Sequence, residues 1–147
     1  MKALTLILFL TIWGVAHAQN DFLVSPEEMS LSNNAASKIT AKSAPQKDAP
    51  LIEVETPVLN SAVSSPTPIK LKFQATAPSS VKPESFKLLY GSWQIDITNR
   101  IAGKAKVTDQ GIEVSKAELP RGHHRLTISV EDTSGRVGSK VIEFEVN

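Results

Sequence analysis

Short runs of alternating hydrophobic and polar residues fill the chain from Leu51 to its last residue. The clearest run is PIKLKFQAT over residues 68–76, where hydrophobic side chains alternate with lysine and glutamine. Alternate side chains of an extended strand point to opposite faces, so this run predicts a strand with one buried and one solvated face. Similar runs cover 51–54, 85–98, 111–114, 124–131 and 140–146.

Within residues 85–98 the hydrophobic positions are even up to Tyr90 and odd from Trp93 onward, so a turn or bulge is expected at Gly91-Ser92. Counting all runs gives about seven strands in roughly 95 residues, a density typical of a β-sandwich. One solvated face per strand favours antiparallel pairing. No segment from residue 51 to 147 has sustained helical periodicity. The sequence therefore predicts an all-β antiparallel sandwich.

Residues 1–18, MKALTLILFLTIWGVAHA, have the features of a secretory signal peptide. Lys2 provides the positive start, an apolar stretch follows, and Ala16-His17-Ala18 is a small-x-small cleavage site. We therefore expect a periplasmic or secreted protein with no transmembrane anchor after cleavage. The absence of cysteine excludes a lipoprotein anchor, and the absence of N-x-[ST] sites favours a bacterial source.

Residues 19–50 are expected to form a flexible N-terminal segment and linker, because residues 35–50 are small, polar and rich in lysine and proline. Ser25-Pro26-Glu27-Glu28 nevertheless has the pattern of a helix start, with a capping serine and a glutamate three residues later. A short helix and a flexible tail both remain open there. The expected organisation is a signal peptide (1–18), this segment (19–50) and one β-sandwich domain (51–147).

Residues 119–146, LPRGHHRLTISVEDTSGRVGSKVIEFEV, resemble the closing F–G hairpin of bacterial immunoglobulin-like (fibronectin-III-like) β-sandwich domains. The matching positions are Leu119, Gly122, His124, Leu126, Ile128, Val130, Asp132, Gly135, Arg136, Phe144 and Val146. The resemblance implies an immunoglobulin-like fold of about seven strands. This family serves in adhesion, in spacing other domains and in binding proteins or sugars, so the resemblance implies no single activity.

Two adjacent histidines, His123 and His124, raise the question of a metal or acid–base site. In a strand they face opposite sides, so they cannot hold one ion together. We expect His123 to be exposed, and His124 to be a buried corner residue whose ring bonds a loop carbonyl. A calcium ion near Asp96 and residues 131–135 is a weaker reading, because an aspartate at a turn is explained by its own turn hydrogen bonds.

No G-x-S-x-G nucleophile motif and no glycine-rich phosphate loop can be written in this chain. We therefore expect no enzymatic activity, no catalytic residue, no cofactor and no bound metal. Loss of the signal peptide leaves basic and acidic residues equal in number, which disfavours nucleic-acid binding.

The expected function is binding or scaffolding of a protein partner in the bacterial envelope. The alternative is a carbohydrate-binding module in which Tyr90 and Trp93 form an exposed platform and Arg100 lines it. Strand parity instead favours Trp93 as a core residue beside Ile95 and Ile97. A partner strand added to an exposed sheet edge is a further option.

Overall fold

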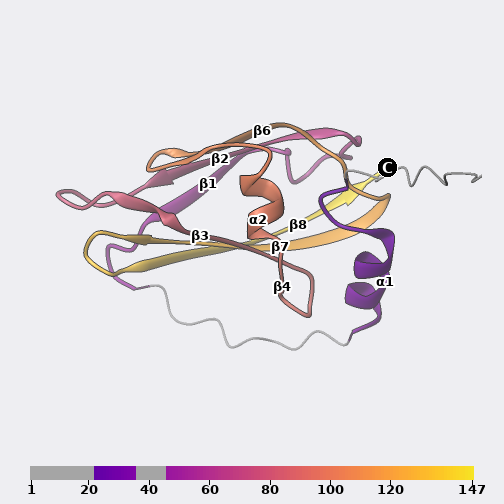
Figure 1. Cartoon of the computed structure of the whole chain (residues 1–147), viewed down its shortest axis with the longest axis horizontal. Coiled ribbons are helices and arrows are strands. Elements are labelled where there is room, and N and C mark those ends of the chain that lie inside the picture. Colours follow the sequence, from indigo (N-terminus) through magenta and orange to yellow (C-terminus); the bar gives the residue numbers. More distant parts are fainter. Residues whose placement is uncertain (1–21, 36–45) are drawn as a thin grey trace, which may run out of the picture.

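The computed structural model describes residues 22–35 and 46–147. Two antiparallel four-stranded sheets pack face to face as a β-sandwich (Figure 1). The strand order is β1-β2-β6-β5 in the first sheet and β4-β3-β7-β8 in the second. The predicted all-β sandwich is confirmed, with eight strands in the described residues where the sequence indicated about seven.

The first sheet contains β1 (Leu51–Thr56), β2 (Thr67–Gln74), β5 (Val107–Thr108) and β6 (Gly111–Ala117). The second contains β3 (Val81–Tyr90), β4 (Ile95–Asp96), β7 (Gly122–Asp132) and β8 (Val137–Val146). Two helices accompany the sheets, α1 (Pro26–Asn34) and α2 (Thr98–Ala102).

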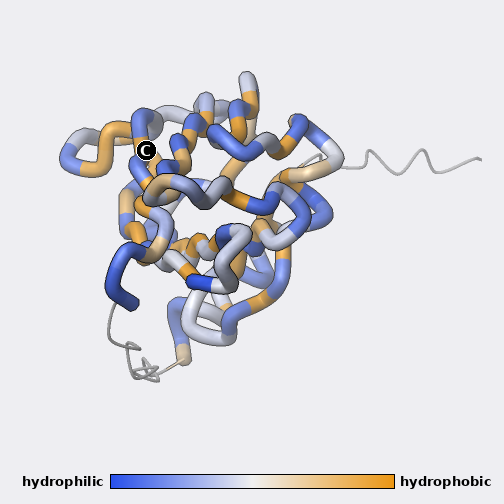
Figure 2. Tube along the Cα trace, turned by 90° about the vertical axis from the view of Figure 1, so that its left-hand side faces the viewer, coloured by the Kyte–Doolittle hydropathy of each residue, from blue (hydrophilic) through white to orange (hydrophobic). Residues whose placement is uncertain are grey.

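The core lies between the sheets and follows the alternation of the sequence. In β2, Ile69, Leu71 and Phe73 are buried, while Lys72 and Gln74 face solvent. The tube in Figure 2 shows the same alternation of hydrophobic and hydrophilic positions along the strands. Burial of these apolar side chains is the main stabilising contribution to such a sandwich.

Helix α2 was not predicted, because one turn of five residues is too short to show helical periodicity. It contributes the fully buried Ile101 to the core. The turn after β7 is formed as the sequence indicates. There Asp132 Oδ1 accepts hydrogen bonds from the backbone N–H groups of Ser134 (2.9 Å) and Arg136 (3.0 Å).

Helix α1 begins where the Ser25-Pro26-Glu27-Glu28 pattern places a helix start. Ser25 Oγ accepts from the Glu28 N–H (3.2 Å), and a Glu28 carboxylate oxygen accepts from the Ser25 N–H (2.9 Å), which completes a capping box. Ahead of the helix, Leu23 and Val24 are completely buried. Leu23 and Val24 were expected to belong to a flexible segment, whereas residues 22–34 pack against the sandwich. The expectation of flexibility was based on the composition of residues 19–50, and two buried apolar residues are too few to change that composition.

The expected signal peptide and most of the expected linker lie outside the described residues. Among the residues that are described, no helix is long and apolar enough to cross a membrane.

Candidate functional site

The turn between β3 and β4 displays Trp93, whose side chain is 62% exposed. Parity favoured a core position, and that prediction is wrong. Gly91 and Gln94 both have positive φ (68° and 53°), so the chain reverses in a tight turn and strand parity does not continue through it. The Gln94 side chain fixes the turn by donating from Nε2 to the Gly91 carbonyl (3.0 Å) and to Thr127 Oγ1 (3.3 Å).

Tyr90 does not share a surface with Trp93, because its side chain is only 1% exposed. It ends β3, and its hydroxyl lies 3.0 Å from His124 Nδ1. Burial raises the pKa of Tyr90 to about 12, which keeps the phenol protonated at neutral pH. The platform of two exposed aromatic residues considered from the sequence is therefore not formed.

His124 points inward from β7 and is completely buried, as strand parity predicts. Its Nε2 lies 2.8 Å from the Pro120 carbonyl, which can only accept, so Nε2 carries the proton. The bare Nδ1 then accepts from the Tyr90 hydroxyl, and the ring stacks on Phe144 with centroids 5.6 Å apart. His124 is thus a neutral imidazole with both nitrogens occupied, in the corner position expected from the sequence.

Acidification is expected to destabilise the fold through His124. Burial lowers the pKa of His124, so the unfolded chain binds a proton at higher pH than the folded chain does. The stability is therefore complete above about pH 6.5, the pKa of an unperturbed histidine, and decreases as the pH falls below it.

The check is the urea midpoint of unfolding at pH 7.5 and pH 5.5, which should be lower at pH 5.5. His124→Gln should flatten this difference, whereas replacing the exposed His123 with glutamine should change it much less, because burial and not the His123 charge is the main cause of the lowered pKa of His124. Equal midpoints in the unmodified chain would contradict the assignment of a neutral buried ring.

Arg100 does not line an aromatic surface but ties α2 to Leu23 and to Glu28 of α1. Its two terminal nitrogens contact the two carboxylate oxygens of Glu28, each at 2.7 Å. One of these nitrogens also donates to the Leu23 carbonyl (3.2 Å). Hydrogen bonds from Arg100 are the main cause that lowers the pKa of Glu28, so this bidentate pair is charged at neutral pH.

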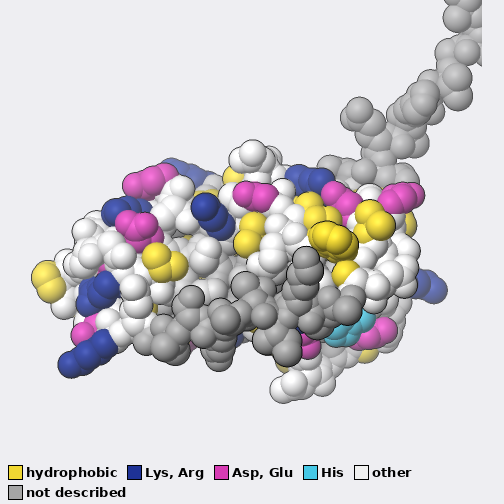
Figure 3. Space-filling view, turned by 90° about the horizontal axis from the view of Figure 1, so that it is seen from below, with side chains coloured by type: hydrophobic (Ala, Val, Ile, Leu, Met, Phe, Trp, Pro, Cys, Tyr) yellow, Lys and Arg dark blue, Asp and Glu magenta, His cyan; other side chains and the backbone are white. Residues whose placement is uncertain are grey.

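Helix α1 contacts the Trp93 turn through Ser32 and carries an exposed hydrophobic residue. Ser32 is buried, and its hydroxyl accepts from the Ser92 N–H (3.0 Å). Gly91 permits this approach, because a Cβ there would lie 1.9 Å from Ser32 Oγ. Leu31, next to Ser32, is 62% exposed. Figure 3 shows hydrophobic side chains gathered toward one end of the face seen from below. We call Leu31 and Trp93 the Trp93 surface.

The acidic residues considered for calcium do not converge. Asp96 accepts from the Thr98 N–H (2.9 Å), and Asp132 binds Arg136 through Oδ2 and Nε (2.8 Å). Within residues 22–35 and 46–147, no three histidine, aspartate or glutamate side chains are grouped so that they could hold an ion.

Strand β8 is the long edge of the second sheet, and its ends are covered. The Val63 N–H donates to the Glu145 carbonyl (3.1 Å), and the Val137 N–H donates to Gln46 Oε1 (2.9 Å). Between them Lys140 reaches across to the Ile52 carbonyl of the first sheet (3.2 Å). A lysine directed inward on an edge strand opposes the addition of another strand. The edge-strand option is therefore disfavoured at β8.

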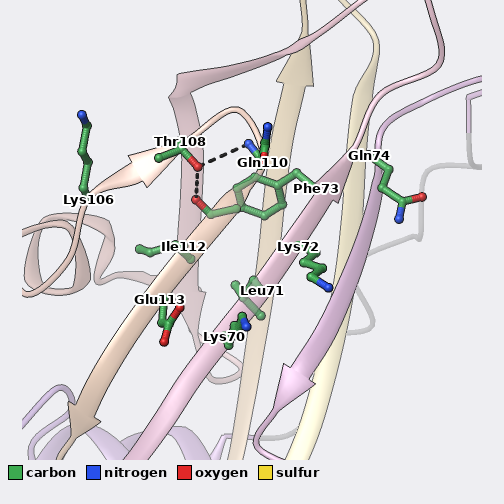
Figure 4. A pocket seen from close by; sticks show the side chains of 11 residues that line it. Lys70, Leu71, Lys72, Phe73, Gln74, Lys106, Thr108, Gln110, Ile112 and Glu113 are labelled. Atoms are coloured by element: carbon green, nitrogen blue, oxygen red, sulfur yellow. Dashed lines mark hydrogen bonds between the residues drawn. The ribbon is translucent and has the colours of Figure 1, made fainter.

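A hollow of about 600 Å³, which no sequence pattern predicted, lies on the first sheet and is lined by residues of β2, β5 and β6 (Figure 4). Lys70 and Lys72 both pair with Glu55, and hydrogen bonding to Glu55 raises the pKa of Lys70, so its amine is protonated. Lys106 points away from these two lysines (Figure 4). The three amines do not converge on one ligand position.

Comparison of the chain with known protein families, with curated proteins and with solved structures finds no match. The candidate site consequently rests on its own geometry.

Proposed function

We propose that the protein is a non-catalytic immunoglobulin-like module that binds a protein partner in the bacterial envelope or outside the cell. The strand order supports the immunoglobulin-like assignment. The sheets β1-β2-β6-β5 and β4-β3-β7-β8 correspond in order to strands A-B-E-D and C′-C-F-G of immunoglobulin-type sandwiches. The signal-peptide pattern of residues 1–18 supports export.

The exposure of Trp93 is the observation that carries the binding proposal. Tryptophan is enriched among the residues that dominate protein–protein affinity, and such residues act best when their backbone is held in place before binding. The Trp93 turn is held by Gln94, and α1, which carries the exposed Leu31, contacts the same turn through Ser32. An aromatic and an aliphatic side chain on a fixed frame favour an apolar patch of another protein as the ligand.

The non-catalytic part of the proposal rests on His124. A serine nucleophile is commonly activated by a neighbouring imidazole with a free nitrogen, and both ring nitrogens of His124 are engaged by Pro120 and Tyr90. The ring is also closed off from solvent.

Replacing Trp93 with alanine should weaken partner binding by about 2 kcal/mol, roughly 30-fold, because a central tryptophan contributes on that scale. Affinity capture from envelope and secreted fractions would supply the partner, and titration would then measure the affinity. Leu31→Ala should weaken binding less. Val58→Ala is the matched control, since Val58 is equally exposed (62%) and lies in the β1–β2 connection. Equal binding by Trp93→Ala and Val58→Ala would exclude this surface.

A carbohydrate ligand is the second candidate, favoured by the exposure of Trp93 alone. Trp93 is the only tryptophan after residue 18, so its fluorescence reports binding directly. If a glycan quenches the Trp93 fluorescence in a saturable way, and an apolar protein partner does not, the carbohydrate ligand would be favoured.

A further inference from the structure

Residues 22–34 pack on the sandwich as a separate piece of chain, which we call the N-terminal segment. It enters beside the end of β6, where Phe22 forms a parallel bridge with Glu118 and the Leu23 N–H donates to the Glu118 carbonyl (2.9 Å). Leu23 and Val24 are then completely buried. A backbone hydrogen bond with two inserted side chains is how proteins take in an extended peptide.

Beyond the inserted pair the segment continues as α1 and is held by polar groups of the sandwich. Arg100 clamps the Glu28 carboxylate with two nitrogens and also binds the Leu23 carbonyl. The Ser92 N–H donates to the Ser32 hydroxyl, and Met29 packs against Gly122. The sandwich thus supplies the cation and two backbone groups, while the segment supplies the apolar pair, a carboxylate and a hydroxyl.

We propose that these sandwich residues form a peptide-binding site. Its ligand is a peptide with two adjacent apolar residues in extended conformation, followed by a serine-capped helix. The helix carries a glutamate four residues after the second apolar residue. The chain's own N-terminal segment fills the site, and the occupant in trans is the same segment of a second copy. This site does not use the Trp93 side chain and needs no external partner, although α1 carries both part of its ligand and Leu31 of the Trp93 surface.

The second copy is favoured because every copy carries both the ligand and the site. Reciprocal exchange between two copies satisfies both sites and closes a two-fold dimer. Within one chain the tethered segment has an effective concentration of about millimolar, so exchange requires either high protein concentration or a weakened internal pair.

Opposite charge exchanges in two full-length chains test the proposal. Glu28→Arg places arginine against Arg100 within its own copy, and Arg100→Glu places glutamate against Glu28. Each variant repels its own segment, yet mixing them gives an arginine–glutamate pair in both sites. We expect each variant alone to be monomeric by light scattering and the mixture to form a one-to-one dimer.

The matched control carries Glu28→Arg and Arg100→Glu in one chain, which restores the internal pair and should remain monomeric. A mixture that stays monomeric, or a control that dimerises as the mixture does, would overturn the exchange. The same experiment in a Trp93→Ala background should be unchanged, so its outcome is independent of the proposed function.

A second measurement does not depend on the charge variants. A protease site introduced between Ala36 and Pro45 allows the folded full chain to be cut, and a labelled peptide of residues 19–35 is then offered in excess. We expect saturable exchange, weakened by about tenfold or more by Arg100→Ala in the protein or by Glu28→Gln in the peptide. Leu31→Ala in the peptide should have no effect. The proposed site would be overturned if the labelled peptide does not exchange, or if the protein unfolds when it loses the segment. It would also be overturned if Arg100→Ala leaves the exchange unchanged.

Discussion

Replacing His124 with leucine should lower the free energy of unfolding by about 4 kcal/mol. The substitution leaves the buried Tyr90 hydroxyl and the partly buried Pro120 carbonyl without their ring partners. An unpaired buried polar group costs about 1–3 kcal/mol, and the loss of the packed ring adds to that cost. The loss is a large fraction of the 5–15 kcal/mol that typically stabilises a domain.

Urea unfolding at pH 7.5 measures this effect, and Tyr90→Phe is the partial variant. Tyr90→Phe leaves only His124 Nδ1 unpaired and should cost about 1–3 kcal/mol. The double variant should cost less than the two singles together, because removing both partners leaves fewer unpaired groups. A His124→Leu protein as stable as the unmodified chain would show that the corner bonds do not contribute.

Replacing Gly111 with alanine should cost about 3 kcal/mol or more, since it combines overpacking with backbone strain. Gly111 starts β6 with φ of 149°, and a Cβ there would lie 2.0 Å from the Leu71 carbonyl oxygen of β2. The backbone must therefore shift where the central strands of the first sheet pair.

Gly135→Ala is the matched control, because Gly135 also has positive φ (79°) but no atom lies within 4 Å of its added Cβ. It should cost about 1 kcal/mol from backbone strain alone. Comparison of the two thermal unfolding midpoints separates the close contact from the strain. Equal losses at both positions would mean that the β2–β6 contact adds nothing.

Strand parity predicts side-chain direction well where a strand is long and unbroken. His124 lies in β7, an eleven-residue strand, and both its inward direction and its bond to a loop carbonyl agree with the structure. Parity fails at Trp93 because the turn from Gly91 to Gln94 separates it from β3. The change of parity predicts a turn at Gly91-Ser92, which the structure confirms, but it does not show that Trp93 lies inside the turn rather than at the start of the next strand.

Contacts distant in sequence were beyond the reach of sequence analysis. The helix start at Ser25 is local, and its capping box is legible in four residues. The burial of Leu23 depends on Glu118 and Arg100, which no local pattern connects to it. Arg100 was selected as a possible ligand contact, but its role as the clamp of Glu28 required the tertiary structure.

The order in which the chain is synthesised affects when the N-terminal segment can pack on the sandwich. Ribosomes make residues 22–34 well before Glu118 and Gly122, against which they pack. Leu23 and Val24 must therefore stay uncovered until Glu118 and Gly122 have been made, and their burial closes a long loop between the N-terminal segment and the end of β6. Seating of these two side chains is accordingly expected to be a late event in maturation.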